Sequence, residues 1–184
     1  YSFNKSPIVG KWTGLTLSWY GDFLDHDNIQ ESIWISVKVC VASTLISVVL
    51  GTLAALSIER FRWWGQKTFD AVLYLPIIIP DVTMAVMLLV FFGETAQWFN
   101  MIPGVNLTDG LEKLVLSHVA FNISFVSVVV RARLANLDSS MEEAAADLYA
   151  SRWGAFRRVT LPQIMPGVLG GALLAITLSL DDVV

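Results

Sequence analysis

Four long apolar segments alternate with polar segments along the chain. The apolar segments are residues 33–58, 69–92, 111–130 and 164–184. As a helix, the first would be about 39 Å long at 1.5 Å per residue, which exceeds the roughly 30 Å hydrocarbon core of a bilayer. The pattern predicts an all-α integral membrane protein with about four membrane-spanning helices.

Basic residues are concentrated in two of the polar segments. Segments 59–68 and 131–163 together hold eight of the 12 Lys and Arg residues. Because Lys and Arg collect in cytoplasmic loops, we expect both segments to face the cytoplasm. Residues 1–32 and the loop 93–110 are then expected on the outer side.

The second apolar segment contains two prolines four residues apart. Pro76 and Pro80 lack a backbone N–H, so we expect the helix to break or kink there. Broken helices inside membranes line cavities, because their freed backbone groups need polar partners. Asp81 directly follows the second proline.

Three carboxylates are candidate functional residues, since ionisable groups in or near a span are usually functional. These are Asp81, Asp181 and Asp182. The alternative is that Asp181 and Asp182 lie at the outer interface or pair with basic residues elsewhere in the protein.

His118 and Asn122 lie four residues apart in the third apolar segment and therefore share a helix face. A polar pair that faces another helix is the favoured interpretation, ahead of a proton relay.

Composition agrees with a membrane protein and excludes several other classes. Apolar residues make up 55% of the chain and charged residues 15%, against about 25% charged in soluble domains. The net charge of −4 argues against a nucleic-acid partner. The single cysteine, Cys40, excludes an intrachain disulfide and a Cys-rich zinc site. Neither a His-Glu-x-x-His motif nor a phosphate-binding P-loop is present, so we expect no enzyme and no ATP hydrolysis in this chain.

The ends of the sequence suggest a fragment. Residue 1 is Tyr rather than Met, and the chain stops within an apolar run. We interpret the chain as an interior part of a longer membrane protein; the alternative is a complete small protein after processing.

The polar segment between the third and fourth apolar segments is expected to form two short helices. Glu142 and Glu143 fall in the first turn of an Ala-rich stretch, where the helix dipole favours acids. Ser151 is placed to cap a second helix that ends near Pro162. Because a helix this short is marginal in water, it needs a surface to pack against.

Residues 143–162 resemble the EAA signature of ABC importer permeases. The family pattern is Glu-Ala-Ala, three residues, Gly, nine residues, Ile, one residue and Leu-Pro, and the spacing fits without a gap. Val159 replaces the Ile, and Tyr149 replaces the Gly. A glycine there suggests a positive φ, so the turn is either built differently here or tolerates a strain of roughly 1–2 kcal/mol.

The resemblance extends over essentially the whole chain. Segments 141–148, 161–168 and 177–184 are similar to the spermidine/putrescine permeases of the PotC type. The resemblance implies a type I ABC importer permease (MetI-like) fold. It also implies one further spanning helix before residue 1, and the remainder of one helix plus another after residue 184.

The resemblance implies a permease subunit of an ATP-driven importer in the bacterial cytoplasmic membrane, with polyamines as cargo. Asp81, Asp181 and Asp182 then form the candidate cargo path, because carboxylates can replace the hydration of a polycation. Its implied partners are a pair of ATPase subunits that bind ATP and Mg, a second permease subunit that is a related chain or a second copy, an extracytoplasmic substrate-binding protein and the lipid bilayer. No cofactor is expected in this chain. The alternatives are an ABC permease for another solute and a secondary transporter.

The EAA segment is implied to be the coupling helix that docks on the ATPase. The residues assigned to docking are Glu143, Ala144, Ala145, Asp147, Leu148 and Ala150. For Glu143, a role as a helix cap is the alternative, and the two roles are compatible.

Overall fold

The computed structural model of the protein describes residues 2–8, 10–99, 101, 110–138 and 140–181. The described residues are mostly helical, and the chain divides into two compact units, Tyr1–Lys38 and Val39–Val184.

The first unit folds around a buried asparagine. Asn4 Nδ2 donates to the Lys11 carbonyl at 2.7 Å, and its Oδ1 accepts from the Thr13 amide at 3.1 Å. The Trp19 indole donates to the Asn4 carbonyl at 2.9 Å. This Trp belongs to α1 (Ser18–Asp25), so the asparagine fixes the preceding loop to the helix.

The second unit is a set of helices connected by short turns. It contains most of α2 (Asp27–Arg60), followed by α3 (Gln66–Ile78), α4 (Asp81–Phe99), α5 (Leu111–Leu134), α6 (Ser140–Asp147), α7 (Arg152–Ala155), the π-helix η1 (Phe156–Thr160) and α8 (Leu161–Asp181). Within the described residues, four helical stretches are long and apolar enough to cross a membrane: α2, α4, α5 and the continuous run Arg152–Asp181.

The expected break at the prolines is present, and it falls at the second one. Ile79 is extended with ψ 130°, as the residue before a proline prefers, and α4 begins directly after Pro80. Pro76 remains inside α3. The range 69–92 is therefore divided between two helices.

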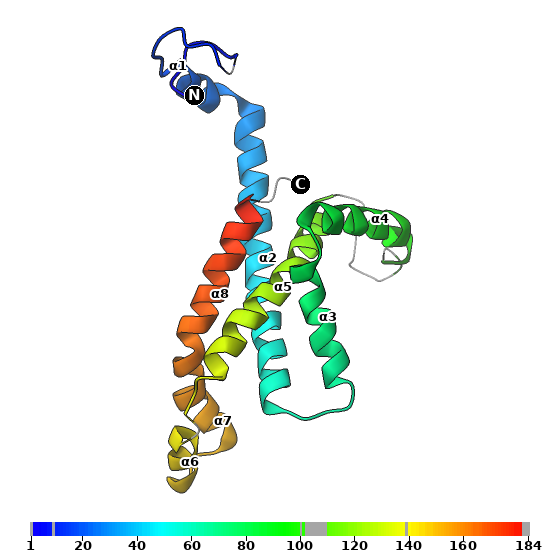
Figure 1. Ribbon diagram of the computed structural model, residues 1–184, viewed down its shortest axis with the longest axis vertical. Coiled ribbons are helices and arrows are strands. Elements are labelled where there is room, and N and C mark those ends of the chain that lie inside the picture. The colour runs from blue at the N-terminus through cyan, green and yellow to red at the C-terminus, as the bar shows by residue number, and fades with distance from the viewer. Residues whose placement is uncertain (1, 9, 100, 102–109, 139, 182–184) are drawn as a thin grey trace. The chain divides into compact units, whose positions relative to one another are not determined.

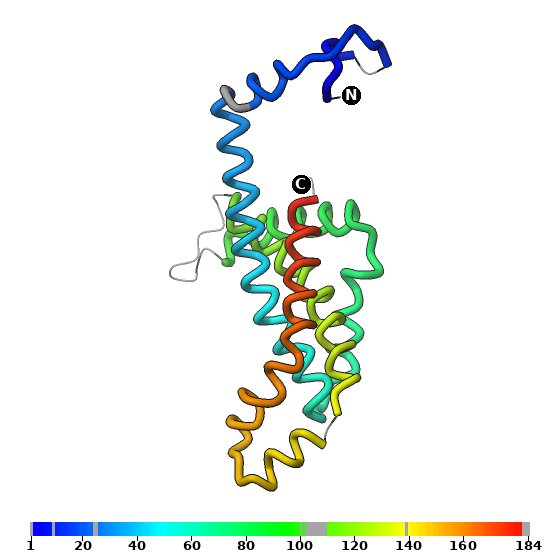
Figure 2. Tube along the Cα trace, turned by 90° about the vertical axis from the view of Figure 1, so that its left-hand side faces the viewer, coloured from blue at the N-terminus to red at the C-terminus, as the bar shows by residue number. Residues whose placement is uncertain are grey.

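Three helices of this unit, α2, α5 and α8, lie side by side and contact through small residues (Figures 1 and 2). A Cβ atom at Gly51 of α2 would lie 2.8 Å from the Cβ of Val126 on α5. One at Gly171 of α8 would lie 3.3 Å from the Cα of the same valine. Small residues recur every four positions on the buried face of α8: Gly167, Gly171, Ala175 and Ser179. Such spacing lets helix backbones approach closely where lipid removes the hydrophobic driving force.

The other helix bounds extend beyond the apolar segments. The segment 33–58 lies inside α2, and 111–130 lies inside α5. The fourth helix begins at Leu161 rather than 164, and residues 182–184 lie outside the described chain. Apolar patterning marks only the stretch that suits lipid, whereas backbone hydrogen bonding continues through polar residues until a breaker is reached.

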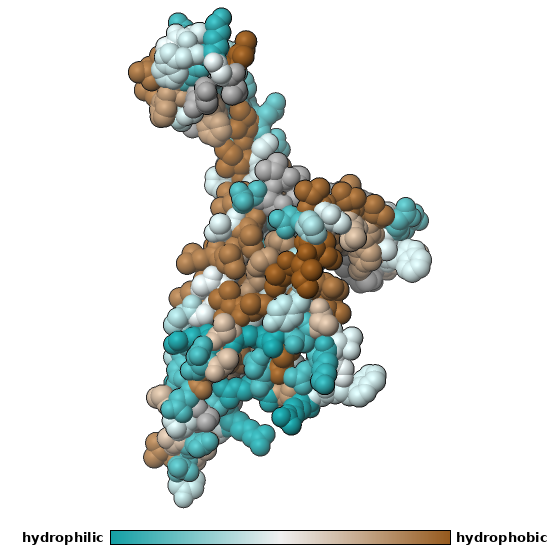
Figure 3. Space-filling view, viewed as in Figure 1, coloured by the Kyte–Doolittle hydropathy of each residue, from teal (hydrophilic) through white to brown (hydrophobic). Residues whose placement is uncertain are grey.

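The surface of the second unit is divided into an apolar and a polar zone. On the face shown in Figure 3, apolar side chains gather over its middle, and polar side chains gather towards the end that contains the α2–α3 connection. That end also holds α6 and α7 (Figure 1).

Candidate coupling site and cargo path

The EAA segment forms a helical projection at one end of the second unit. Helices α6 and α7 lie beyond the adjoining ends of α5 and α8 (Figure 1). They contact each other and η1. The first expected short helix is present as α6. The second begins at Arg152, but it does not end near Pro162 as expected, because α7, η1 and α8 form one continuous helical run to Asp181.

Most of the residues assigned to docking are exposed on this projection. Ala145 is half-buried, and the other five are exposed: Glu143, Ala144, Asp147, Leu148 and Ala150. Leu148 is 82% exposed and Tyr149 98% exposed, which is unusual for large side chains at a tight turn. The structure therefore brings all six candidates together on α6 and the turn that follows it.

The turn after α6 is a Schellman motif with tyrosine at the glycine position. The Ala150 amide donates to the Ala145 carbonyl at 3.0 Å, and the Tyr149 amide donates to the Ala146 carbonyl at 2.9 Å. This pair of bonds defines the motif, whose penultimate residue is left-handed. Tyr149 has φ 59°. The turn is therefore built with the positive φ that a glycine would favour, and the strain is tolerated.

The cap predicted for the second short helix is confirmed. Ser151 is the N-cap of α7, and its Oγ accepts from the Gly154 amide at 3.1 Å. The helix then widens into η1, where the Leu161 amide bonds five residues back to the Phe156 carbonyl. Pro162 lacks an N–H and clashes with the carbonyl four residues before it, which accounts for a widened turn here.

Glu142 attaches α6 to two other helices, α2 and η1. Its carboxylate accepts from Arg60 Nη1 at 2.5 Å and Nη2 at 2.6 Å, and from Thr160 Oγ1 at 2.5 Å. We call this set of three residues the Glu142 bridge. The hydrogen bonds from Arg60 lower the pKa of the Glu142 carboxyl, partial burial opposes that shift, and the Thr160 hydroxyl adds to it.

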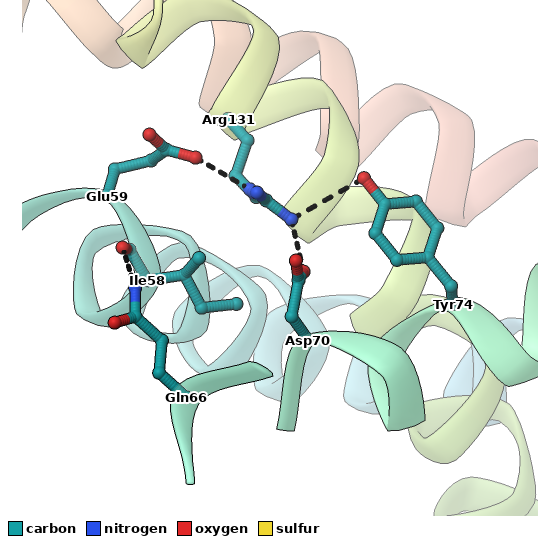
Figure 4. Close-up of polar contacts among 6 residues, drawn as sticks. All are labelled: Ile58, Glu59, Gln66, Asp70, Tyr74 and Arg131. Atoms are coloured by element: carbon teal, nitrogen blue, oxygen red, sulfur yellow. Dashed lines mark hydrogen bonds and ion pairs between the residues drawn. The ribbon is translucent and has the colours of Figure 1, made fainter. Parts of the chain in front are cut away.

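A second ionic cluster lies at the same end, around Arg131 of α5 (Figure 4). Its Nε donates to Glu59 at 2.8 Å, and its Nη1 donates to Asp70 at 2.5 Å and to the Tyr74 hydroxyl at 3.4 Å. Glu59 belongs to α2, whereas Asp70 and Tyr74 belong to α3. One guanidinium thus joins three helices.

Asp81 lies at the wall of a cavity of about 430 Å³ between α4 and the first half of α5. The other polar side chains of the lining are Lys113, Ser117 and His118. Apolar side chains such as Phe92 line the remainder. The charged side chains among the described residues of the lining are thus one carboxylate, Asp81, and one ammonium group, Lys113.

The other two carboxylates of the candidate cargo path are not brought to that cavity. Asp181 is the exposed last residue of α8 and is not among the described residues that line it. Asp182 lies outside the described residues. Among the residues that the structure describes, no group of three His, Cys, Asp or Glu side chains could hold a metal ion.

The polar pair on α5 faces the neighbouring helices. His118 Nδ1 lies 3.1 Å from Ser179 Oγ on α8, which in turn lies 3.4 Å from Ser43 Oγ on α2. Asn122 is fully buried one turn further along. The prediction that this pair faces another helix is confirmed for His118.

Three features of the structure were not anticipated from the sequence. The Glu142 bridge and the Arg131 cluster join residues that are 18 to 82 positions apart in the chain, so spacing could not reveal them. The repeat of small residues at 167, 171, 175 and 179 is visible in the sequence and would have marked the packing face of α8.

Comparison with known proteins identifies a family. The family described as "Binding-protein-dependent transport system inner membrane component" matches residues 47–184.

Individual relatives align over the whole chain. The "Putrescine transport system permease protein PotI" of Escherichia coli (strain K12) is 38% identical over 185 residues, which cover 100% of this chain and 64% of that protein. The "Spermidine/putrescine transport system permease protein PotC" of the same strain is 36% identical over 183 residues, covering 100% of this chain and 66% of that protein. The chain thus spans slightly less than two thirds of the length of these relatives.

A solved structure shares the fold. A chain of a bacterial ABC transporter involved in the import of the acidic polysaccharide alginate matches with a TM-score of 0.74 over 98% of this chain and 64% of that one. The sequence identity is 20%, so this match speaks for the fold alone.

Proposed function

Because this chain belongs to the family of binding-protein-dependent transport system inner membrane components, we propose that it is a permease subunit of an ATP-driven polyamine importer. The observation that supports this best is the identity of 36–38%, along the entire chain, to permeases named for putrescine and for spermidine/putrescine. The protein would act in the bacterial cytoplasmic membrane and form part of the translocation pathway.

The coupling segment gives this proposal its mechanism. ATP hydrolysis belongs to a separate pair of subunits, and α6 with its following turn docks on them. The exposed surface supports this role, because Leu148 and Tyr149 present apolar area to a partner while the small Ala144 permits close backbone approach. Closure of the ATPase pair then moves α6, and the end of the bundle to which α6 is attached.

The orientation of the chain follows from the same assignment. Segments 59–68 and 131–163 carry eight of the 12 Lys and Arg residues and face the cytoplasm. The expected loop 93–110 starts later than predicted, because α4 continues to Phe99. The end of α4, the segment after it and residues 1–32 face outwards, towards a substrate-binding protein that delivers cargo. A second permease subunit completes the pore.

Asp81 is our candidate for cargo contact. A polyamine is a flexible polycation, so carboxylates along its path can replace part of its hydration. Asp81 lies on the wall of the cavity between α4 and α5, at the break between α3 and α4. Asp181, at the end of α8, is a second candidate at a different place, and Asp182 follows it in the sequence.

The decisive test is cargo-stimulated ATPase activity of the full-length permease, reconstituted with its partner permease and ATPase subunits and screened over polyamines. We expect putrescine or spermidine, delivered by the binding protein, to raise ATP hydrolysis and to accumulate in the vesicles only when ATP is present. Uptake driven by an ion gradient without ATP would instead favour a secondary transporter.

A second candidate function within the family is import of a different solute. The "Molybdenum transport system permease protein ModB" of Haemophilus influenzae is 32% identical over 159 residues, which cover 83% of this chain and 68% of that protein. Including molybdate and other small solutes in the screen separates this possibility from polyamine import.

A further inference from the structure

Helix α6 is attached to the second unit by polar contacts rather than by burial of apolar side chains. None of its eight residues is buried. Glu142 is the member of α6 that reaches α2, and both of its carboxylate oxygens are engaged by the Arg60 guanidinium. Two parallel charge-assisted hydrogen bonds fix orientation as well as distance.

Packing around this contact is open. A cavity of about 510 Å³ lies beside it, lined by Arg60, Glu142 and Thr160 and by side chains of α2, α6, α7 and η1. Because space separates these elements here, apolar packing cannot replace the ionic contact as the attachment between α2 and α6. Thr160 is 4% exposed, so the third member of the Glu142 bridge is anchored in the core.

The receiving end of the bridge is itself held on its other side. Arg60 is the last residue of α2, and the preceding residue, Glu59, pairs with Arg131. Arg131 in turn pairs with Asp70 of α3. Helices α3 and α5 therefore either resist a displacement of Arg60 or move together with it, through Glu59 and Arg131.

The two glutamates of the first turn of α6 have different surroundings. Glu142 is half-buried and turned towards Arg60, whereas Glu143 is exposed. Both carry the same charge at adjacent positions, so the same substitution at each removes the same charge from the same helix turn.

We propose that Glu142 is a positioning residue that fixes the coupling helix α6 to the end of α2, so that movement imposed on α6 reaches the membrane bundle. In this arrangement Glu143 contacts the ATPase, and Glu142 transmits the resulting movement of α6 to α2. The inference rests on the proposed function, because it assumes that α6 is moved by an ATPase.

The test compares Glu142→Gln with Glu143→Gln in the full-length permease, assembled with its partner subunits in vesicles. For Glu142→Gln we expect normal co-purification of the ATPase and continued ATP hydrolysis, but uptake per ATP lowered on the order of tenfold, because a neutral amide cannot hold the guanidinium by two charge-assisted bonds. For Glu143→Gln we expect reduced co-purification of the ATPase.

A charge exchange provides a second measurement. Arg60→Glu and Glu142→Arg should each lower uptake per ATP, and the double variant should recover much of it, because the pair is restored with its charges reversed. Normal uptake per ATP in Glu142→Gln would overturn the proposal, as would a double variant no better than either single one.

Amide hydrogen exchange separates the bridge from the transport function. Glu142→Gln should speed exchange in residues 141–149 of the full-length protein, and Glu143→Gln should not. If both variants exchange alike, Glu142 does not hold α6 and the proposal is wrong. If the wild-type complex shows no ATP-driven uptake, the proposed function and the coupling role fail together, while the exchange data still decide whether the bridge holds α6.

Discussion

Tyr149 adopts a backbone conformation that glycine usually fills. Its φ of 59° completes the Schellman turn after α6, and its side chain is 98% exposed. A residue with a Cβ pays roughly 1–2 kcal/mol for this conformation. The spacing of the EAA signature predicted a special backbone at this position, whereas only the structure shows that the turn keeps its form despite the substitution.

The strain at this turn predicts opposite effects for two substitutions. Tyr149→Gly should slow amide exchange across 144–150, because it removes the strain, and Tyr149→Val should speed it, because a β-branched residue at positive φ is an outlier. Leu148→Val is the control for a β-branched side chain at an adjacent exposed position without positive φ. Equal exchange in the two valine variants would show that the conformation of Tyr149 carries no strain.

The lowered pKa of the Glu142 carboxyl predicts the pH range over which α6 stays attached to α2. Its pKa is lowered in the folded protein, chiefly by hydrogen bonds from Arg60. A group with a lowered pKa stabilises the folded state above its ordinary pKa and loses that effect as pH falls through the lowered value. We expect protection of α6 to be constant from pH 7 to about 5 and to fall only below about 4.

A second carboxyl titrates in the same range and must be separated from the first. Hydrogen bonds from Ser140 lower the pKa of Asp138, which precedes α6. In Asp138→Asn the loss of protection at low pH should remain, and in Glu142→Gln protection should be low at every pH. Pulsed hydrogen exchange of the full-length protein across this pH range makes the distinction; an unchanged acid transition in Glu142→Gln would refute the assignment.

At the scale of helices, the sequence determined which segments are helical far better than how they pack. Apolar runs located α2, α5 and α8, and the prolines at 76 and 80 predicted the break between α3 and α4. The helix breaks at Pro80 rather than at Pro76. Ile79, which precedes Pro80, is extended, whereas Pro76 remains inside α3. Contacts between helices depend on residues far apart in the chain, and no periodicity of one helix specifies its partner.

The close contact between α2 and α5 predicts that the same Gly→Ala substitution has different effects at different positions. Gly51→Ala should destabilise the fold by about 1–3 kcal/mol, because the new Cβ would lie 2.8 Å from that of Val126. Gly93→Ala, in α4, should be harmless, since nothing lies within 4 Å of the added atom.

A compensating change makes this prediction sharper. Combining Val126→Gly with Gly51→Ala should relieve part of the clash, because it removes both the Cβ at 2.8 Å and the Cγ1 at 2.9 Å, although the Ile123 carbonyl at 3.0 Å remains. Thermal unfolding of the full-length protein in detergent measures all four proteins. Equal stability of Gly51→Ala and Gly93→Ala would mean that α2 and α5 are not in close contact.

At the scale of the whole molecule, Glu143 tests whether transport depends on docking of the ATPase to α6. Glu143→Lys should leave membrane insertion unchanged and lower both ATPase co-purification and uptake, because it reverses a charge on the exposed face of the coupling helix. Quantitative co-purification with the ATPase, normalised to inserted permease, measures the effect. Wild-type values for both quantities would remove Glu143 from the docking surface.

The cargo path supplies the prediction that concerns the molecule as a transporter. Asp81 is the first residue of α4, where the helix dipole stabilises a negative charge. Its carboxylate can therefore stabilise the helix, contact the cargo, or do both. Asp81→Asn keeps a residue suited to a helix start and removes the charge. If the carboxylate replaces hydration of a polycation, uptake of putrescine or spermidine should fall at least roughly tenfold.

Glu94→Gln is the matched control, since Glu94 lies on the same helix and is not among the described residues that line the cavity. Asp181→Asn tests the second candidate separately, because Asp181 does not line that cavity either. Uptake and ATP hydrolysis are measured in the same vesicles, so that a cargo defect lowers transport while the EAA segment still holds the ATPase. Unchanged uptake and unchanged selectivity among polyamines in both aspartate variants would exclude these carboxylates from the path.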